Sequence, residues 1–188
     1  MIFKEAFKIA GFDLEWWKDH DRHGWAEGVP RVPEGFWRTI VADRGPNGSN
    51  PPSWYPRACM DCLNNNLRPN GDFRPDDVLE LERASRIAKD FVRRVKDVIS
   101  ERRFVKVKLE GEKKYTYGLV PAETRKEDLI CVLFGGSAPV VLRPEGKGGQ
   151  AHFTMLGECF IYGMMEGEAV PGESWRHPYD SAELFDLV

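Results

Sequence analysis

Residues 128–169 read DLICVLFGGSAPVVLRPEGKGGQAHFTMLGECFIYGMMEGEA and decide the fold class. The stretch holds three apolar runs, Leu129–Phe134, Pro139–Leu142 and Phe153–Tyr162, and each is bounded by Gly or Pro. Short runs of Val, Ile, Leu and aromatic residues between such breakers favour buried strands over helices. The stretch therefore predicts a compact β-structure with tight reversals.

Two further strands are predicted directly before this stretch. From Phe104 to Leu109 apolar residues alternate with lysines, and Glu110–Glu112 then turns the chain back into Tyr115–Val120. Together with the three runs this makes about five strands, and their connections are too short for parallel crossovers, which need roughly a dozen residues. Closure of a bent sheet into a barrel would also remove exposed edges. We therefore expect a small antiparallel, barrel-like sheet of about five strands over residues 103–170.

One long amphipathic helix is predicted from Asp76 to about Arg102. Pro75 and the acidic residues after it are typical of a helix start. The apolar positions recur at steps of three and four, which gives one apolar stripe; they are Leu81, Ala84, Ala88, Phe91, Val95 and Val98. We expect the helix to pack on the sheet, and a coiled coil with a partner helix is the alternative.

Residues 1–75 are expected to be helical or irregular and rich in tryptophan. Helical spacing predicts a short helix within Met1–Trp17, a second at Phe36–Val41, and a third from Ser53, as N-cap, to Leu63. The tryptophans are interpreted as core or seam residues rather than a ligand cage; they are Trp16, Trp17, Trp25, Trp37 and Trp54. Residues 171–188 read as a tail with a final helix from Asp180 or Ser181. The expected fold is a single α+β domain over residues 1–188.

Composition narrows the function classes. The 188 residues are 41% hydrophobic and carry a net charge of -3 with the two signs mixed, which disfavours nucleic acid as a partner. No apolar run approaches the roughly 20 residues of a membrane span, and the N-terminus lacks the apolar core of a secretory signal. Four cysteines are too few for a disulfide-rich domain. We expect a cytoplasmic protein with reduced thiols.

Several separated segments together resemble the C-terminal region of fungal heterokaryon-incompatibility (HET) domain proteins. The segments are Phe36–Thr39 with Ala42–Arg44, Arg102–Phe104, Tyr117–Pro121, Leu129–Gly136, Val141–Pro144 and Gly157–Ala169. The resemblance covers about residues 36–169, most of the chain. In that family the HET domain itself precedes this region, and residues 1–75 show no parallel βαβ pattern that would correspond to it.

The resemblance implies an interaction or sensing module that acts in non-self recognition or regulation. It supplies no catalytic residue, because none is established for this C-terminal module. The implied partner is a protein, and a homodimer is left open. The alternative is a small stand-alone enzyme of secondary metabolism, an isomerase or cyclase, that acts on an apolar small molecule in an aromatic-lined pocket.

Three residues are the candidate site. Asp43 and Arg44 precede a loop rich in Gly, Pro and Asn, where they could orient a polar ligand or form an ion pair that ties the loop to the protein body. Glu158 lies within an apolar run and could act as a general acid or base. Its alternative role is an ion pair with Arg143 or Arg103.

Cys59 and Cys62 form a C-x-x-C pair. With His20 and His23 they could hold zinc, although the classical order and spacing are absent, or they could form a redox dithiol. Two ordinary helix cysteines are the favoured interpretation. Gly135-Gly136 and residues 146–149 lack the sequence context of a phosphate loop. No metal and no cofactor are therefore expected.

Overall fold

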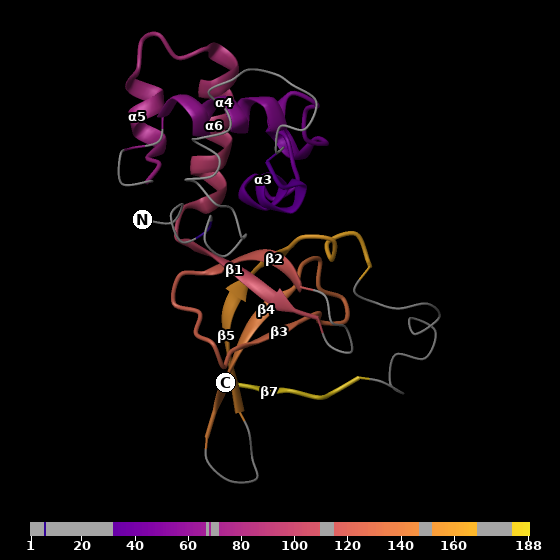
Figure 1. The fold of residues 1–188 in the computed structure, drawn as a ribbon. Helices are drawn as coiled ribbons and strands as arrows, with labels where there is room; N and C mark the ends of the chain where they lie inside the picture. Colours follow the sequence, from indigo (N-terminus) through magenta and orange to yellow (C-terminus); the bar gives the residue numbers. More distant parts are fainter. Residues whose placement is uncertain are drawn as a thin grey trace.

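The computed structural model describes residues 6, 32–66, 68, 72–109, 115–146, 152–168 and 182–188. In this part of the chain helices gather on one side and two small sheets on the other, so the fold is mixed α+β (Figure 1). The helices are α3 Glu34–Ile40, α4 Tyr55–Asn66, α5 Pro75–Glu80 and α6 Arg86–Ile99. The strands are β1 Arg102–Lys108, β2 Tyr115–Pro121, β3 Leu129–Cys131, β4 Val140–Glu145, β5 His152–Glu158, β6 Phe160–Ile161 and β7 Asp186–Leu187.

The predicted helices at Phe36–Val41 and Ser53–Leu63 are α3 and α4. The apolar side of α3, which includes Phe36, Trp37 and Ile40, is buried as its spacing indicates. The helix predicted within Met1–Trp17 lies outside the described residues except for Ala6, which is helical and buried. Trp16, Trp17 and Trp25 also lie outside them.

The single helix predicted over residues 76–102 is wrong, because α5 and α6 are separate helices. Leu81 leaves α5 in an extended conformation, with φ -73° and ψ 112°. The side-chain oxygen of Ser85 then accepts a hydrogen bond from the backbone nitrogen of Ala88 at 3.1 Å and caps a new helix. A serine that satisfies a free N–H at a helix start favours a new N-terminus over continuation.

The strands form two sheets and, within the described residues, no closed barrel. The first sheet has the order β1-β2-β6 and the second β3-β4-β5-β7. The break at Cys159 explains the difference from the barrel-like prediction. There the chain leaves β5 of the second sheet and enters β6 of the first, and the Cys159 nitrogen donates to the Pro139 oxygen at 2.8 Å.

Strand pairing is antiparallel, as predicted, except at β7. The predicted C-terminal helix is absent from residues 182–188, where β7 instead pairs parallel with the start of β5. Phe185 packs edge-on against Phe153 with ring centroids 4.8 Å apart, and the Val188 nitrogen donates to the Phe153 oxygen at 3.1 Å. These non-local contacts favour an extended backbone at the C-terminus.

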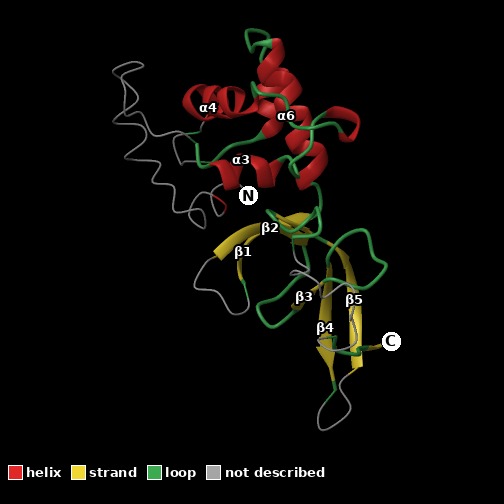
Figure 2. Cartoon of the chain, turned by 90° about the vertical axis from the view of Figure 1, so that its right-hand side faces the viewer, coloured by secondary structure: helices red, strands yellow, loops and turns green. Residues whose placement is uncertain are grey.

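The main core lies between the helices and the first sheet. Phe91 and Val95 of α6 join Phe36 of α3, while Phe104 and Leu119 come from the sheet. Trp37 is buried in this core and Trp54 packs against it, which agrees with the core interpretation of these two tryptophans. A smaller cluster fills the space between the two sheets. Figure 2 shows the helices stacked on the first sheet, with the β4–β5 hairpin extending away from them. No described helix could cross a membrane.

Candidate functional site

A cleft of about 700 Å³ lies where the helices meet the sheets. Its walls come from α3 and the turn after it, the end of α6, the start of β1, β2, the loop before β4, and residues 158–168. The three residues predicted as a site, Asp43, Arg44 and Glu158, all line this cleft. Segments more than a hundred positions apart in the chain are therefore brought together in one cleft.

The turn after α3 presents two of these residues through an unusual backbone. Ala42 and Asp43 are consecutive residues with positive φ, 51° and 48°. The Asp43 nitrogen donates to the Arg38 oxygen at 2.7 Å, and the Arg44 nitrogen donates to the Val41 oxygen at 3.3 Å. Left-handed backbone is unfavourable for a residue with a Cβ, so this turn is held by its surroundings.

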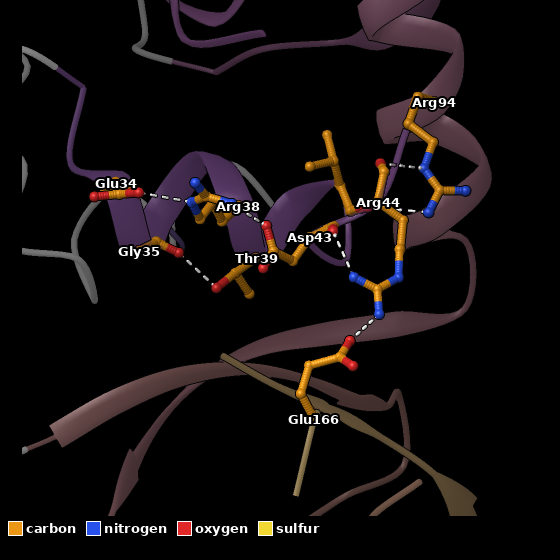
Figure 3. Close-up of polar contacts among 9 residues, drawn as sticks. Glu34, Gly35, Arg38, Thr39, Asp43, Arg44, Arg94 and Glu166 are labelled. Atoms are coloured by element: carbon orange, nitrogen blue, oxygen red, sulfur yellow. Dashed lines mark hydrogen bonds and ion pairs between the residues drawn. The ribbon is translucent and has the colours of Figure 1, made fainter. Parts of the chain in front are cut away.

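Asp43 and Arg44 are both in ion pairs, but not with each other (Figure 3). The Asp43 carboxylate accepts from the Arg38 guanidinium at 2.5 Å, and Arg38 also binds Glu34 at 2.7 Å. The Arg44 guanidinium reaches across to Glu166, on the loop after β6, and donates to the Asp43 backbone oxygen at 3.3 Å. The Arg44–Glu166 pair therefore ties the helical side of the cleft to the sheet side.

Glu158 has an exposed side chain at the end of β5. The predicted ion pair with Arg143 or Arg103 is wrong, because Arg143 binds Asp128 and Arg103 donates to the Thr124 oxygen at 2.8 Å. Arg102 instead donates to the backbone oxygen of Glu158 at 3.2 Å. The carboxylate of Glu158 lines the cleft and has no ion-pair partner within the described part of the chain.

The arginines and the carboxylates of the cleft differ in whether they have partners within the protein. Arg38, Arg44 and Arg102 all donate to oxygens of the protein, whereas Asp97 and Glu158 have no ion pair among the described residues. Carboxylates without a cationic partner leave a negative potential over a concave surface. The cleft is therefore suited to a cationic group rather than to an anion.

Sequence reasoning missed several residues of the cleft. Arg38 and Glu34 lie four positions apart on α3, a spacing that places them on one helix face and could have indicated the pair. No local pattern indicates Glu166, because its partner is 122 positions away in the chain. Tyr162 also lines the cleft, and burial raises the pKa of its phenol.

The cysteine pair is part of the helical core. Cys59 and Cys62 are buried on α4 and unpaired, and burial raises the pKa of both thiols, that of Cys62 to about 12. Zinc binding and thiol redox chemistry both require a thiolate, so these positions disfavour either role. Among the described residues no three His, Cys, Asp or Glu side chains converge as metal ligands, while His20 and His23 lie outside them.

Comparison of the chain with known protein families, with curated proteins and with solved structures found no match.

Proposed function

We propose that the chain is an interaction or sensing module of the kind found in the C-terminal part of fungal HET incompatibility proteins. In this proposal the cleft receives a segment of a protein partner during non-self recognition or regulation. The activity is binding, and the charged side chains of the cleft select the partner.

One observation carries the proposal: four of the six segments that bear the resemblance contribute residues to the cleft. Most of its lining comes from residues 36–44 and 157–169, and Arg102 and Leu119 add one residue each from two further segments. These segments are far apart in the sequence. A shared binding surface is a physical reason for one chain to carry these four segments, because separated segments act jointly only where folding brings them together.

The charge pattern supports a basic segment as the occupant. Glu158 and Asp97 lack ion pairs in the described part of the chain, while the arginines of the cleft are engaged. A lysine or arginine of the partner would gain a carboxylate without displacing an existing pair. Complementary charge contributes mainly to specificity and association rate, so binding should weaken as salt is raised.

Site-specific photo-crosslinking in cells that express the chain tests the proposal. A photoreactive amino acid replaces Ser137, an exposed residue of the cleft, and in a matched control it replaces Lys126, which is exposed outside the cleft. We expect a discrete protein adduct from position 137 only. Glu158→Lys should remove the adduct, while Glu127→Lys, at an exposed position outside the cleft, should leave it unchanged. Equal labelling from both positions would refute a partner-binding cleft.

A small stand-alone enzyme is the second candidate. Its support is the cleft volume of about 700 Å³, which falls within the range of small-molecule sites, together with the carboxylate of Glu158. Asp43 is held by Arg38, so Glu158 is the freer acid or base for an isomerase or cyclase. Nine of the 19 lining residues are charged, and Phe160 and Tyr162 are the aromatic residues of the wall. This favours binding of a charged partner over an apolar metabolite.

A metabolite profile separates the two candidates. A deletion strain is complemented with the wild-type chain, with Glu158→Gln, or with the control Glu127→Gln. For an enzyme, Glu158→Gln should reproduce the profile of the deletion strain, because the amide retains the shape but cannot transfer a proton. For an interaction module, all three complemented strains should share one metabolite profile.

A further inference from the structure

Arg94 lies behind the cleft, on α6, and is not part of its wall. Its guanidinium donates to two backbone oxygens of the turn after α3, to that of Val41 at 3.0 Å and to that of Arg44 at 3.2 Å (Figure 3). A planar guanidinium can hold two acceptors in a fixed geometry, which an ammonium cannot do. Arg94 therefore binds the turn at both ends.

The two residues between these oxygens are the ones with left-handed backbone. Ala42 and Asp43 have φ values of 51° and 48°, and neither is the glycine that such a conformation favours. Each would be more stable, taken alone, with negative φ. The clamp by Arg94 spans this unfavourable pair and opposes its relaxation.

The direction of two cleft side chains depends on this backbone. With the turn as it stands, the Asp43 carboxylate meets Arg38, and the Arg44 guanidinium meets Glu166 on the sheet side of the cleft. A turn relaxed to negative φ would redirect both side chains, because Cβ directions follow the backbone dihedral angles. The ion pair that joins the two sides of the cleft would then be lost.

We propose that Arg94 is the positioning residue of the cleft. It holds the Val41–Arg44 turn in its strained form and so sets the Arg44–Glu166 pair that joins the two walls. Arg94 thereby controls the cleft without being part of its wall. The importance of this control rests on the proposed function, but its physical test needs no partner.

The first measurement is amide hydrogen exchange in the full chain. Arg94→Met removes the guanidinium and keeps an unbranched apolar stem. We expect the amides of Ala42, Asp43 and Arg44 to exchange roughly tenfold faster, the factor that corresponds to one left-handed residue no longer held. Arg93→Met is the matched control, because Arg93 is the neighbouring arginine and its ion pair among the described residues is with Asp90 at 2.7 Å. It should leave exchange in the turn unchanged.

The second measurement asks whether a glycine in the turn restores protection from exchange when Arg94 is absent. Gly adopts positive φ without a Cβ penalty, so Ala42→Gly in the Arg94→Met background should restore much of the lost protection. If Arg94 only filled space against the helices, Ala42→Gly would not restore it. Arg94→Lys, which retains the charge but not the two-pronged geometry, should give an intermediate effect and serves as the test variant if Arg94→Met fails to fold.

The third measurement is a double-mutant cycle between Arg44→Gln and Glu166→Gln. The coupling should be measurable in the wild-type background and should vanish in the Arg94→Met background. Unchanged exchange in the turn, or undiminished coupling without Arg94, would overturn the proposal. Either result would leave the crosslinking test of the proposed function unaffected, so the two failures are distinguishable.

Discussion

Arg143 and Asp128 form a two-pronged ion pair that fixes the turn after β2 onto β4. The Arg143 guanidinium donates to both carboxylate oxygens of Asp128, at 3.0 and 2.8 Å, and the Asp128 side chain is only 3% exposed. Asp128 also accepts from the Arg125 nitrogen at 2.7 Å, while Arg143 donates to the Glu123 oxygen at 2.9 Å. Removal of either side chain would leave buried polar groups without partners.

We expect Asp128→Asn to destabilise the fold by about 2 kcal/mol near neutral pH, because hydrogen bonds to a buried charge are lost. The hydrogen bond from Arg143 lowers the pKa of Asp128 in the folded chain. The contribution of the carboxylate is therefore complete above its ordinary pKa of about 4 and is lost as the pH falls through the lower, folded-state value. Urea unfolding at about pH 7 and pH 2 measures it.

The difference in the free energy of unfolding between wild type and Asp128→Asn should be smaller in acid than at neutral pH. Asp76→Asn is the control, because Asp76 pairs with Lys96 at a site where both side chains are more than half exposed. Exposed ion pairs contribute little to stability. Equal effects of the two substitutions at neutral pH would contradict the structural role of the Arg143–Asp128 pair.

Ser85→Ala should cost about 1 kcal/mol of the free energy of unfolding, since the N-cap hydrogen bond to Ala88 at 3.1 Å is removed. The comparable variant is Ser100→Ala, at the other end of α6, where the serine is exposed and makes no side-chain hydrogen bond within the described residues. Thermal unfolding compares the two. A loss for Ser100→Ala as large as that for Ser85→Ala would contradict the cap.

The break before α6 shows where periodicity alone is insufficient. The apolar steps from Leu81 through Ala84 to Ala88 continue in helical register across the break, so they predicted one helix. The local signal against it was Ser85, a residue typical of helix starts. The β7 pairing had no such signal, because it depends on Phe153, far away in the sequence. In contrast, alternation and breakers were sufficient for the strands β1 to β5, whose pairing partners are close in sequence.

For the candidate site too, local sequence patterns indicated individual residues but not their distant partners. Loop composition indicated Asp43 and Arg44, and a lone carboxylate in an apolar run indicated Glu158, and all three line one cleft. Their partners were not predictable, since ion pairs depend on register and on turns between distant segments. The two arginines expected near Glu158 bind the turn after β2 instead.

The buried cysteines should resist thiol reagents. Burial raises the pKa of Cys59 well above its ordinary value and that of Cys159 to about 12, so little thiolate forms near pH 8 in the folded chain. We expect Cys131, which is partly exposed, to be labelled first by a disulfide reagent, and the other three only on unfolding. Counting labelled thiols with time measures this. Rapid paired oxidation of Cys59 with Cys62 in the native chain would restore the redox interpretation.

Gly118 allows β6 to approach β2 closely, and this approach places two residues of the cleft. It lies opposite Ile161, and a Cβ at this position would fall 2.7 Å from Ile161 Cδ1 and 2.8 Å from the Phe160 backbone oxygen. Gly118→Ala should therefore destabilise the fold by about 2 kcal/mol, as overpacking of a core does. It should also displace Phe160 and Tyr162, which line the cleft.

A smaller side chain at Ile161 should relieve this clash only in part. Ile161→Val removes the Cδ1 atom and alone should cost about 1 kcal/mol, but in the Gly118→Ala background it should cost less or restore stability. The contact with the Phe160 oxygen remains in the double variant, because a backbone atom cannot turn away as a side chain does. Denaturant midpoints of the four chains test this. If the two substitutions lower the stability additively, the close approach of β6 to β2 does not depend on the absence of a side chain at Gly118.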